Sequence, residues 1–178
     1  MKTLAQIERL ISKLNYVFFR IGAFATFCLI VLMLTSVLAR YLFQSSYVWF
    51  DELLWHIFGL SFLLGSSYTL NQDGHVRVDI FYQKYSPKIK AWVDIAGVLF
   101  FMIPLCGLLA FHGYFYAESS FQNGEISGSP NGLPYRWIIK SAIPLGFLLL
   151  ILQSVSHLIK QIFVLAEQPE ISKDISTK

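Results

Sequence analysis

The chain has 178 residues, of which 55% are hydrophobic and only 14% are charged. A soluble domain usually carries about 25% charged residues, so this composition excludes an ordinary soluble core and indicates a membrane protein. The formal net charge of +3 is small and comes without a block of Lys and Arg. This excludes a nucleic-acid-binding surface and leaves the basic residues as markers of membrane topology.

The first element expected along the chain is an amphipathic helix over residues 3–15. Apolar residues recur there at helical spacing, while polar and charged residues fill the rest of the helical wheel. Such a segment is expected to lie in the membrane interface before the chain turns into the bilayer. The alternative is an extension of the first membrane span. The apolar positions are Leu4, Ile7, Leu10, Ile11 and Leu14.

Four apolar runs follow, and each is long enough to cross about 30 Å of hydrocarbon. They cover residues 17–39, 48–70, 91–112 and 137–159, and a polar tail covers residues 167–178. The first run is too long for the core of a secretory signal and has no small-residue cleavage site after it, so it is expected to remain in the protein. The sequence therefore predicts one all-α integral membrane domain over residues 1–178, with four transmembrane helices and the N-terminal amphipathic helix.

Lysine and arginine residues are unevenly divided among the connections. They gather before the first span, between spans two and three, and after span four, whereas the other two connections are nearly bare. Cytoplasmic segments carry the excess of positive charge in multi-pass membrane proteins. The sequence therefore predicts that both termini are cytoplasmic. The basic residues on that side are Lys2, Arg9, Lys13, Arg77, Lys84, Lys88, Lys90, Lys160, Lys173 and Lys178.

The second span contains a stripe of polar and small residues. Glu52, His56, Gly59, Leu63 and Ser66 are separated by steps of four and three residues, so they share one helical face. One interpretation is a cation or proton site on Glu52 and His56, because ionisable residues inside a span are costly. The other is a seam that packs against another helix, since small residues allow close approach. The packing seam is favoured, because no second carboxylate lies at the same depth.

Other functions stay open at this point. Histidines at matched depth, His56 with His112 and His75 with His157, permit a b-type haem or quinone-linked membrane anchor. A small channel would require a polar stripe along a full span. A carrier working alone would require a broken helix near the midplane of the membrane. The two cysteines stand singly and form no C-x-x-C pair, so no metal or redox centre is predicted.

Two segments carry a resemblance to a known family. WFDELLWHIFGLSFLLGSSYTLNQDGHVRVDIF has a Trp, an acidic pair that ends in Glu, a small-residue patch and a later Gly-His-Val-x-Val-Asp. The second segment, SGSPNGLPYRWIIKSAIPLGFLLLILQ, resembles the start of the fourth span in the same family. With the four-span layout, these motifs resemble the small membrane subunit, DctQ type, of tripartite ATP-independent periplasmic (TRAP) transporters. The matching positions are Trp49, Asp51, Glu52, Gly65 to Ser67, Gly74, His75, Val76, Val78, Asp79, Pro134, Trp137, Pro144, Gly146 and Gln153.

The resemblance implies a supporting role. In this family a soluble periplasmic protein captures an organic acid, and a large membrane subunit carries the substrate and sodium sites. The small subunit is expected to brace the large one in the bacterial inner membrane, without enzymatic activity or cofactor. Its partners would be the large permease subunit, the soluble periplasmic binding protein and membrane lipids. Residues expected at the large-subunit interface, or in structural roles, are Trp49, Glu52, His56, Gly59, Ser66, Gly74, His75, Arg77, Asp79, Pro134, Trp137, Pro144, Gly146 and Gln153.

The loop over residues 121–135 is predicted to face the periplasm. It is rich in Gly, Pro and Ser, as turn-forming loops are. A solvated loop is the default interpretation. Its position also allows a part in docking the soluble binding protein, for which Glu125, Asn131 and Arg136 are the candidates.

Overall fold

The computed structural model describes residues 2–71 and 85–166. Within these residues every regular element is helical: α1 (Lys2–Phe43), α2 (Val48–Asn71), α4 (Pro87–Gly97), the π-helical turn η1 (Val98–Met102), α5 (Ile103–Gln122) and α6 (Trp137–Leu165). Four stretches are long and apolar enough to cross a membrane: Thr3–Phe43, Val48–Leu70, Pro87–Gln122 and Trp137–Leu165. The predicted all-α fold with four membrane-spanning helices is therefore confirmed.

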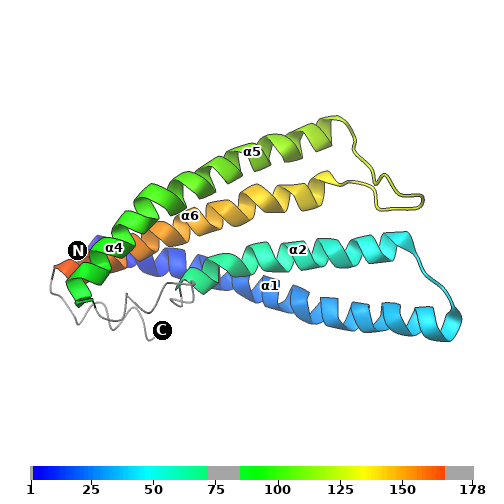
Figure 1. The fold of residues 1–178 in the computed structure, drawn as a ribbon, viewed down its shortest axis with the longest axis horizontal. Coiled ribbons are helices and arrows are strands. Elements are labelled where there is room, and N and C mark those ends of the chain that lie inside the picture. Colours follow the sequence, from blue (N-terminus) through cyan, green and yellow to red (C-terminus); the bar gives the residue numbers. More distant parts are fainter. Residues whose placement is uncertain (1, 72–84, 167–178) are drawn as a thin grey trace.

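The helices form an elongated bundle built from two antiparallel hairpins (Figure 1). α1 and α2 make the first hairpin, and α4–η1–α5 makes the second with α6. α6 joins the two hairpins, because it packs on α1, α2, α4 and α5. We call one end of the bundle the terminal end; it holds the first turns of α1 and α4 and the last turns of α6 (Figure 1). The opposite loop end holds residues 44–47 and 123–136.

α1 is a single unbroken helix of 42 residues. At 1.5 Å per residue it is about 63 Å long, roughly twice the thickness of the hydrocarbon core. Residues 3–15 were expected to form a separate amphipathic helix, but they are the first turns of α1. Glu8, Ser12 and Asn15 of this segment pack on α6 rather than facing water, and these contacts hold it in line with the rest of α1.

The other helices also differ from the expected spans at their ends. The third span, expected over residues 91–112, lies within α4–η1–α5, which covers residues 87–122. α6 begins at the expected residue 137 but continues to Leu165. Hydropathy measures how far a helix is apolar, whereas a helix ends where its backbone groups find other hydrogen-bond partners. α4, for example, begins where the Ser86 hydroxyl accepts a hydrogen bond from the Ile89 N–H at 3.4 Å.

Three glycines bring neighbouring helices close together. A Cβ atom on Gly22 of α1 would lie 3.1 Å from a backbone carbonyl oxygen of α2. A Cβ atom on Gly146 of α6 would lie 2.9 Å from the Cβ atom of Leu63, and one on Gly113 of α5 would lie 2.9 Å from Ile143. In lipid, where apolar surface gains nothing by leaving the solvent, helix association relies on such close packing. The α1–α2, α2–α6 and α5–α6 contacts therefore each use a position with no room for a side chain.

The outward faces of the bundle are strongly apolar. Phe100 and Phe101 of η1 are each 76% exposed, and Phe24 of α1 is 68% exposed. Exposed apolar surface of this extent marks contact with lipid or with another membrane-embedded protein. Polar side chains, by contrast, gather inside the bundle at its two ends.

Candidate functional site

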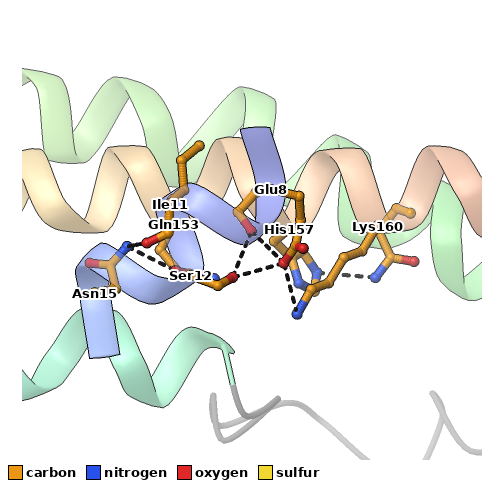
Figure 2. A network of polar contacts seen from close by, with 9 residues as sticks. Glu8, Ile11, Ser12, Asn15, Gln153, His157 and Lys160 are labelled. Atoms are coloured by element: carbon orange, nitrogen blue, oxygen red, sulfur yellow. Dashed lines mark hydrogen bonds and ion pairs between the residues drawn. The ribbon is translucent and has the colours of Figure 1, made fainter. Parts of the chain in front are cut away.

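A buried polar cluster joins α1 to α6 at the terminal end (Figure 2). Glu8 of α1 is only 1% exposed. Its Oε1 atom accepts hydrogen bonds from the hydroxyls of Ser12 at 2.7 Å and Ser156 at 3.2 Å, and it lies 3.7 Å from the Lys160 ammonium. A buried carboxylate requires a counter-charge and hydrogen-bond donors, and α6 supplies both.

A second contact lies two turns further along α1. The Asn15 amide donates to the Gln153 side-chain oxygen at 2.9 Å and to the Ile11 backbone oxygen at 3.2 Å (Figure 2). Asn15 and Gln153 are both fully buried. Hydrogen bonds between polar side chains are a common means of joining helices within a membrane. We call the whole set the α1–α6 tie; it consists of Glu8, Ser12, Asn15, Gln153, Ser156 and Lys160.

The polar cluster continues from α6 to α4. His157 Nε2 lies 3.6 Å from an Asp94 carboxylate oxygen, and both side chains are almost completely buried. The same nitrogen lies 3.2 Å from the Gln161 amide nitrogen. Asp94 and His157 are ionisable residues in separate spans of the sequence, and the fold brings them together. The terminal end is therefore held by polar contacts from three helices.

Glu52 makes the corresponding contact at the loop end. Its Oε1 atom accepts a hydrogen bond from the Ser127 hydroxyl, and its Oε2 atom accepts one from the Leu133 backbone N–H at 2.7 Å. Both donors belong to the loop between α5 and α6. The carboxylate of α2 thus holds the second hairpin's loop, and we call these three residues the Glu52 tie. The neighbouring Asp51 faces α1 instead, where it pairs with Arg40 at 3.4 Å.

The same loop has a second anchor on α6. The Lys140 ammonium donates a hydrogen bond to the Glu125 carboxylate and lies 3.8 Å from the centre of the Tyr116 ring. The bond from Lys140, with a smaller effect of Ser120, lowers the pKa of Glu125 below its ordinary value. The Arg136 N–H donates to the Glu125 backbone oxygen at 3.2 Å, which closes the base of the loop.

The candidate docking residues of this loop have different surroundings. Glu125 is engaged by Lys140, whereas Asn131 is exposed at the turn. Asn131 has a φ of 59°, a left-handed conformation that asparagine tolerates better than most residues. Tyr135, with a φ of 59°, is 65% exposed just before α6. Asn131 and Tyr135 are therefore exposed at the loop end, whereas Glu125 is held by Lys140.

The stripe on the second span packs inside the chain. A Cβ atom on Gly59 would lie 3.9 Å from Ile139 of α6, and Leu63 lies against Gly146 of the same helix. His56 Nδ1 lies 2.5 Å from the Glu52 backbone oxygen. These contacts favour the interpretation as a packing seam over that as a cation or proton site.

The remaining residues predicted from the sequence fall into two groups, those that the structure describes and those that lie outside the described residues. Pro144 lies within α6 against Gly113, and the Trp137 ring packs edge-on against Phe121 at 5.2 Å. Trp49 and Pro134 are exposed at the loop end, and the Ser66 hydroxyl bonds to its own helix. Gly74, His75, Arg77 and Asp79 lie outside the described residues.

Sequence reasoning found Gln153 but missed the rest of the α1–α6 tie. Glu8, Ser12 and Asn15 recur at steps of four and three, and Gln153, Ser156 and Lys160 do the same in α6. Two polar stripes of matching period are the signal that would have paired them. Among residues 2–71 and 85–166, no group of three or more His, Cys, Asp and Glu side chains is placed to hold a metal ion.

The comparison with known families agrees with this architecture. The family model for tripartite ATP-independent periplasmic transporters, DctQ component, matches residues 29–164, which is more than half of the chain. The match begins within α1 and ends near the end of α6, so it includes the Glu52 tie but not Glu8, Ser12 and Asn15. No curated protein matches the chain. The chain therefore belongs to the DctQ component family of TRAP transporters, a family of membrane transport components rather than of enzymes.

Proposed function

We propose that this chain is the static brace of a TRAP transporter, a small subunit that supports a larger elevator-type permease subunit in the inner membrane. One observation carries this proposal: the acidic side chains inside its helices are engaged by the chain itself. Glu8 meets α6, Glu52 meets the loop and Asp94 meets His157. A carrier site needs polar groups available to a substrate or ion. Here such groups fix the helices together, which is what a rigid support requires.

The outer surface supports the same proposal. α1 and α5 present large apolar side chains outwards, including Phe24, Phe27 and Phe111. A membrane-embedded partner could bury part of that surface, and lipid would cover the rest. Extra static helices give a moving permease domain a broader fixed frame in the bilayer.

The substrate, the coupling ion and the soluble partner follow from the family rather than from this chain. We propose sodium-coupled uptake of organic acids, with substrate captured by a periplasmic binding protein. The excess of Lys and Arg at the terminal end supports cytoplasmic termini. The loop over residues 123–136 would then face the periplasm, where Asn131 and Arg136 are available to meet the binding protein.

Reconstitution tests the brace. Proteoliposomes would contain this chain, the large permease subunit, or both, with the binding protein outside and an inward sodium gradient. We expect uptake from a panel of radiolabelled organic acids only when both membrane subunits are present. Uptake by this chain alone would overturn the proposal.

A second measurement separates support from ion coupling. Glu52→Gln should weaken retention of the large subunit on co-purification, while the number of sodium ions per transported acid stays the same. Asp51→Asn is the matched control, since it removes a neighbouring carboxylate that does not contact the loop. A changed sodium stoichiometry with intact assembly would assign Glu52 to coupling instead.

A further inference from the structure

Most cationic side chains in the described part of the protein have an acidic neighbour or another partner. Lys88 and Lys90 each take part in an interaction. Arg136 lies near enough to Glu125 to contribute to its lowered pKa. Three more cations form ion pairs: Lys160 with Glu8, Arg40 with Asp51, and Lys140 with Glu125.

Three cations of α1 differ from all of these. Arg9, Lys13 and Arg20 are exposed and make no hydrogen bond or ion pair with the residues that the structure describes. They are separated by four and seven residues, so they lie along one stripe of the helix. At 1.5 Å per residue the stripe is about 17 Å long. A line of three charges without counter-charge among residues 2–71 and 85–166, on a membrane-spanning helix, calls for a partner beyond those residues.

The surroundings of this stripe indicate which class of molecule could bind to it. On one side of it lies the face of α1 that packs on α6 through Glu8 and Asn15. On the other side lies an apolar face, where Leu10 is 70% exposed and Val17 is 49% exposed. The cations therefore run along the border between protein and a surface suited to acyl chains. Long basic side chains in this setting reach towards phosphate groups while their stems lie on hydrocarbon.

We propose that Arg9, Lys13 and Arg20 form a binding surface for the headgroup of an anionic phospholipid, with its acyl chains against Leu10, Leu14 and Val17. The phosphodiester and the additional negative charge of such a lipid match a linear set of cations. An acidic segment of a partner protein would match the charges but not the adjoining apolar face. This inference does not depend on the role as a brace, because it concerns the chain and the bilayer alone.

Lipid retention by the purified full-length chain tests the proposal. The chain in mild detergent would be mixed with equal amounts of dioleoyl phosphatidylglycerol and dioleoyl phosphatidylcholine, and bound lipid counted by native mass spectrometry. We expect a preference of about tenfold or more for phosphatidylglycerol, given the attraction of each basic residue to anionic lipid. The triple variant Arg9→Gln, Lys13→Gln, Arg20→Gln should reduce this preference to less than about twofold. Circular dichroism of the variant establishes that it is folded.

A matched control removes the same charge from elsewhere. The triple variant Arg40→Gln, Lys88→Gln, Lys90→Gln should keep the preference, since these residues lie off the stripe. Equal losses in both triple variants would assign the effect to net charge and overturn the proposal. So would a wild-type chain that retains both lipids equally. If the α1 variant kept its lipid preference but lost the large permease subunit on co-purification, the stripe would be a protein contact and the proposal would also be wrong.

Discussion

The two ends of the bundle are joined by carboxylates that act in different ways. At the terminal end Glu8 is buried between two helices, and its partners from the second hairpin are the side chains of Ser156 and Lys160. At the loop end Glu52 holds a loop through the Ser127 hydroxyl and the Leu133 backbone N–H. A helix-to-helix contact stabilises the whole bundle, whereas a helix-to-loop contact orders one segment. The same residue type is therefore expected to govern global stability at one end and local order at the other.

Breaking the terminal-end tie should have the largest effect. Lys160→Met leaves the Glu8 carboxylate buried without a counter-charge, which is expected to lower the free energy of unfolding by about 3 kcal/mol. Chemical unfolding of the purified chain in mild detergent measures this loss. The double variant Glu8→Gln with Lys160→Met removes both charges and should recover most of it. An equally unstable double variant would contradict the charge-pairing role of Lys160.

Substitution in the contact between α2 and α6, which lies between the two ends, should have the next largest effect. Gly146→Ala places a Cβ atom 2.9 Å from the Leu63 Cβ atom and 3.3 Å from the Leu63 backbone oxygen, so α6 must move away from α2. We expect a loss of about 1–3 kcal/mol in the same unfolding assay, as for other overpacked positions. Gly107→Ala is the control, because nothing lies within 4 Å of its added methyl group. Alanine favours a helix more than glycine does, so Gly107→Ala should not lose stability, and an equal loss at both positions would contradict the packing explanation.

Removing the loop-end tie should act locally. Glu52→Gln weakens the bonds to Ser127 and Leu133, so the amide of Leu133 should exchange its hydrogen faster, with little change in the unfolding midpoint of the bundle. Hydrogen exchange followed by mass spectrometry resolves peptides of the loop from peptides of α6. Asp51→Asn, one residue away, should leave the loop unchanged. Faster exchange along the whole of α6 would mean that Glu52 supports the bundle as Glu8 does.

The smallest expected effect is a pH dependence of the same loop. Lys140, and to a lesser extent Ser120, lower the pKa of Glu125 below its ordinary value of 4.5. A lowered folded-state pKa means that the contact stabilises the loop above pH 4.5 and is lost as the pH falls through the lowered value. Loop exchange rates, corrected for intrinsic chemistry, should therefore stay level down to pH 4.5 and rise below it. Lys140→Met should remove this rise, and a transition above pH 4.5 would assign it to another group.

The four helices could be predicted from the sequence because hydropathy over about 20 residues is a direct requirement of the bilayer. The hydrogen-bond partners of Glu52 could not be predicted from the sequence. One of them is the backbone N–H of Leu133, a group that every residue except proline carries, so no sequence pattern distinguishes it. The seam of Gly59 and Leu63 was predicted to face protein, but its partner helix became known only from the fold.

Residues 3–15 show a different limit. The spacing of Glu8, Ser12 and Asn15 indicates one polar face, and such a face usually meets water. It meets α6 here, because Gln153 and Ser156 present polar groups at matching heights. A single amphipathic pattern does not reveal whether its polar side faces solvent or a second polar stripe. That choice depends on both helices together.

The π-helical turn η1 has a consequence for comparing this chain with its relatives. The Ile103 N–H bonds to the Val98 carbonyl five residues earlier, so this turn holds one residue more than an α-helical turn. One residue corresponds to a rotation of about 100° around a helix. η1 thus sets which side of α4 faces α6, and it is Asp94 that meets His157. A relative lacking one residue between positions 98 and 102 would be expected to turn a different α4 position towards α6. An alignment of this chain with such a relative would then have to match the helices before and after η1 by their structure, because counting residues across the turn would pair the wrong positions.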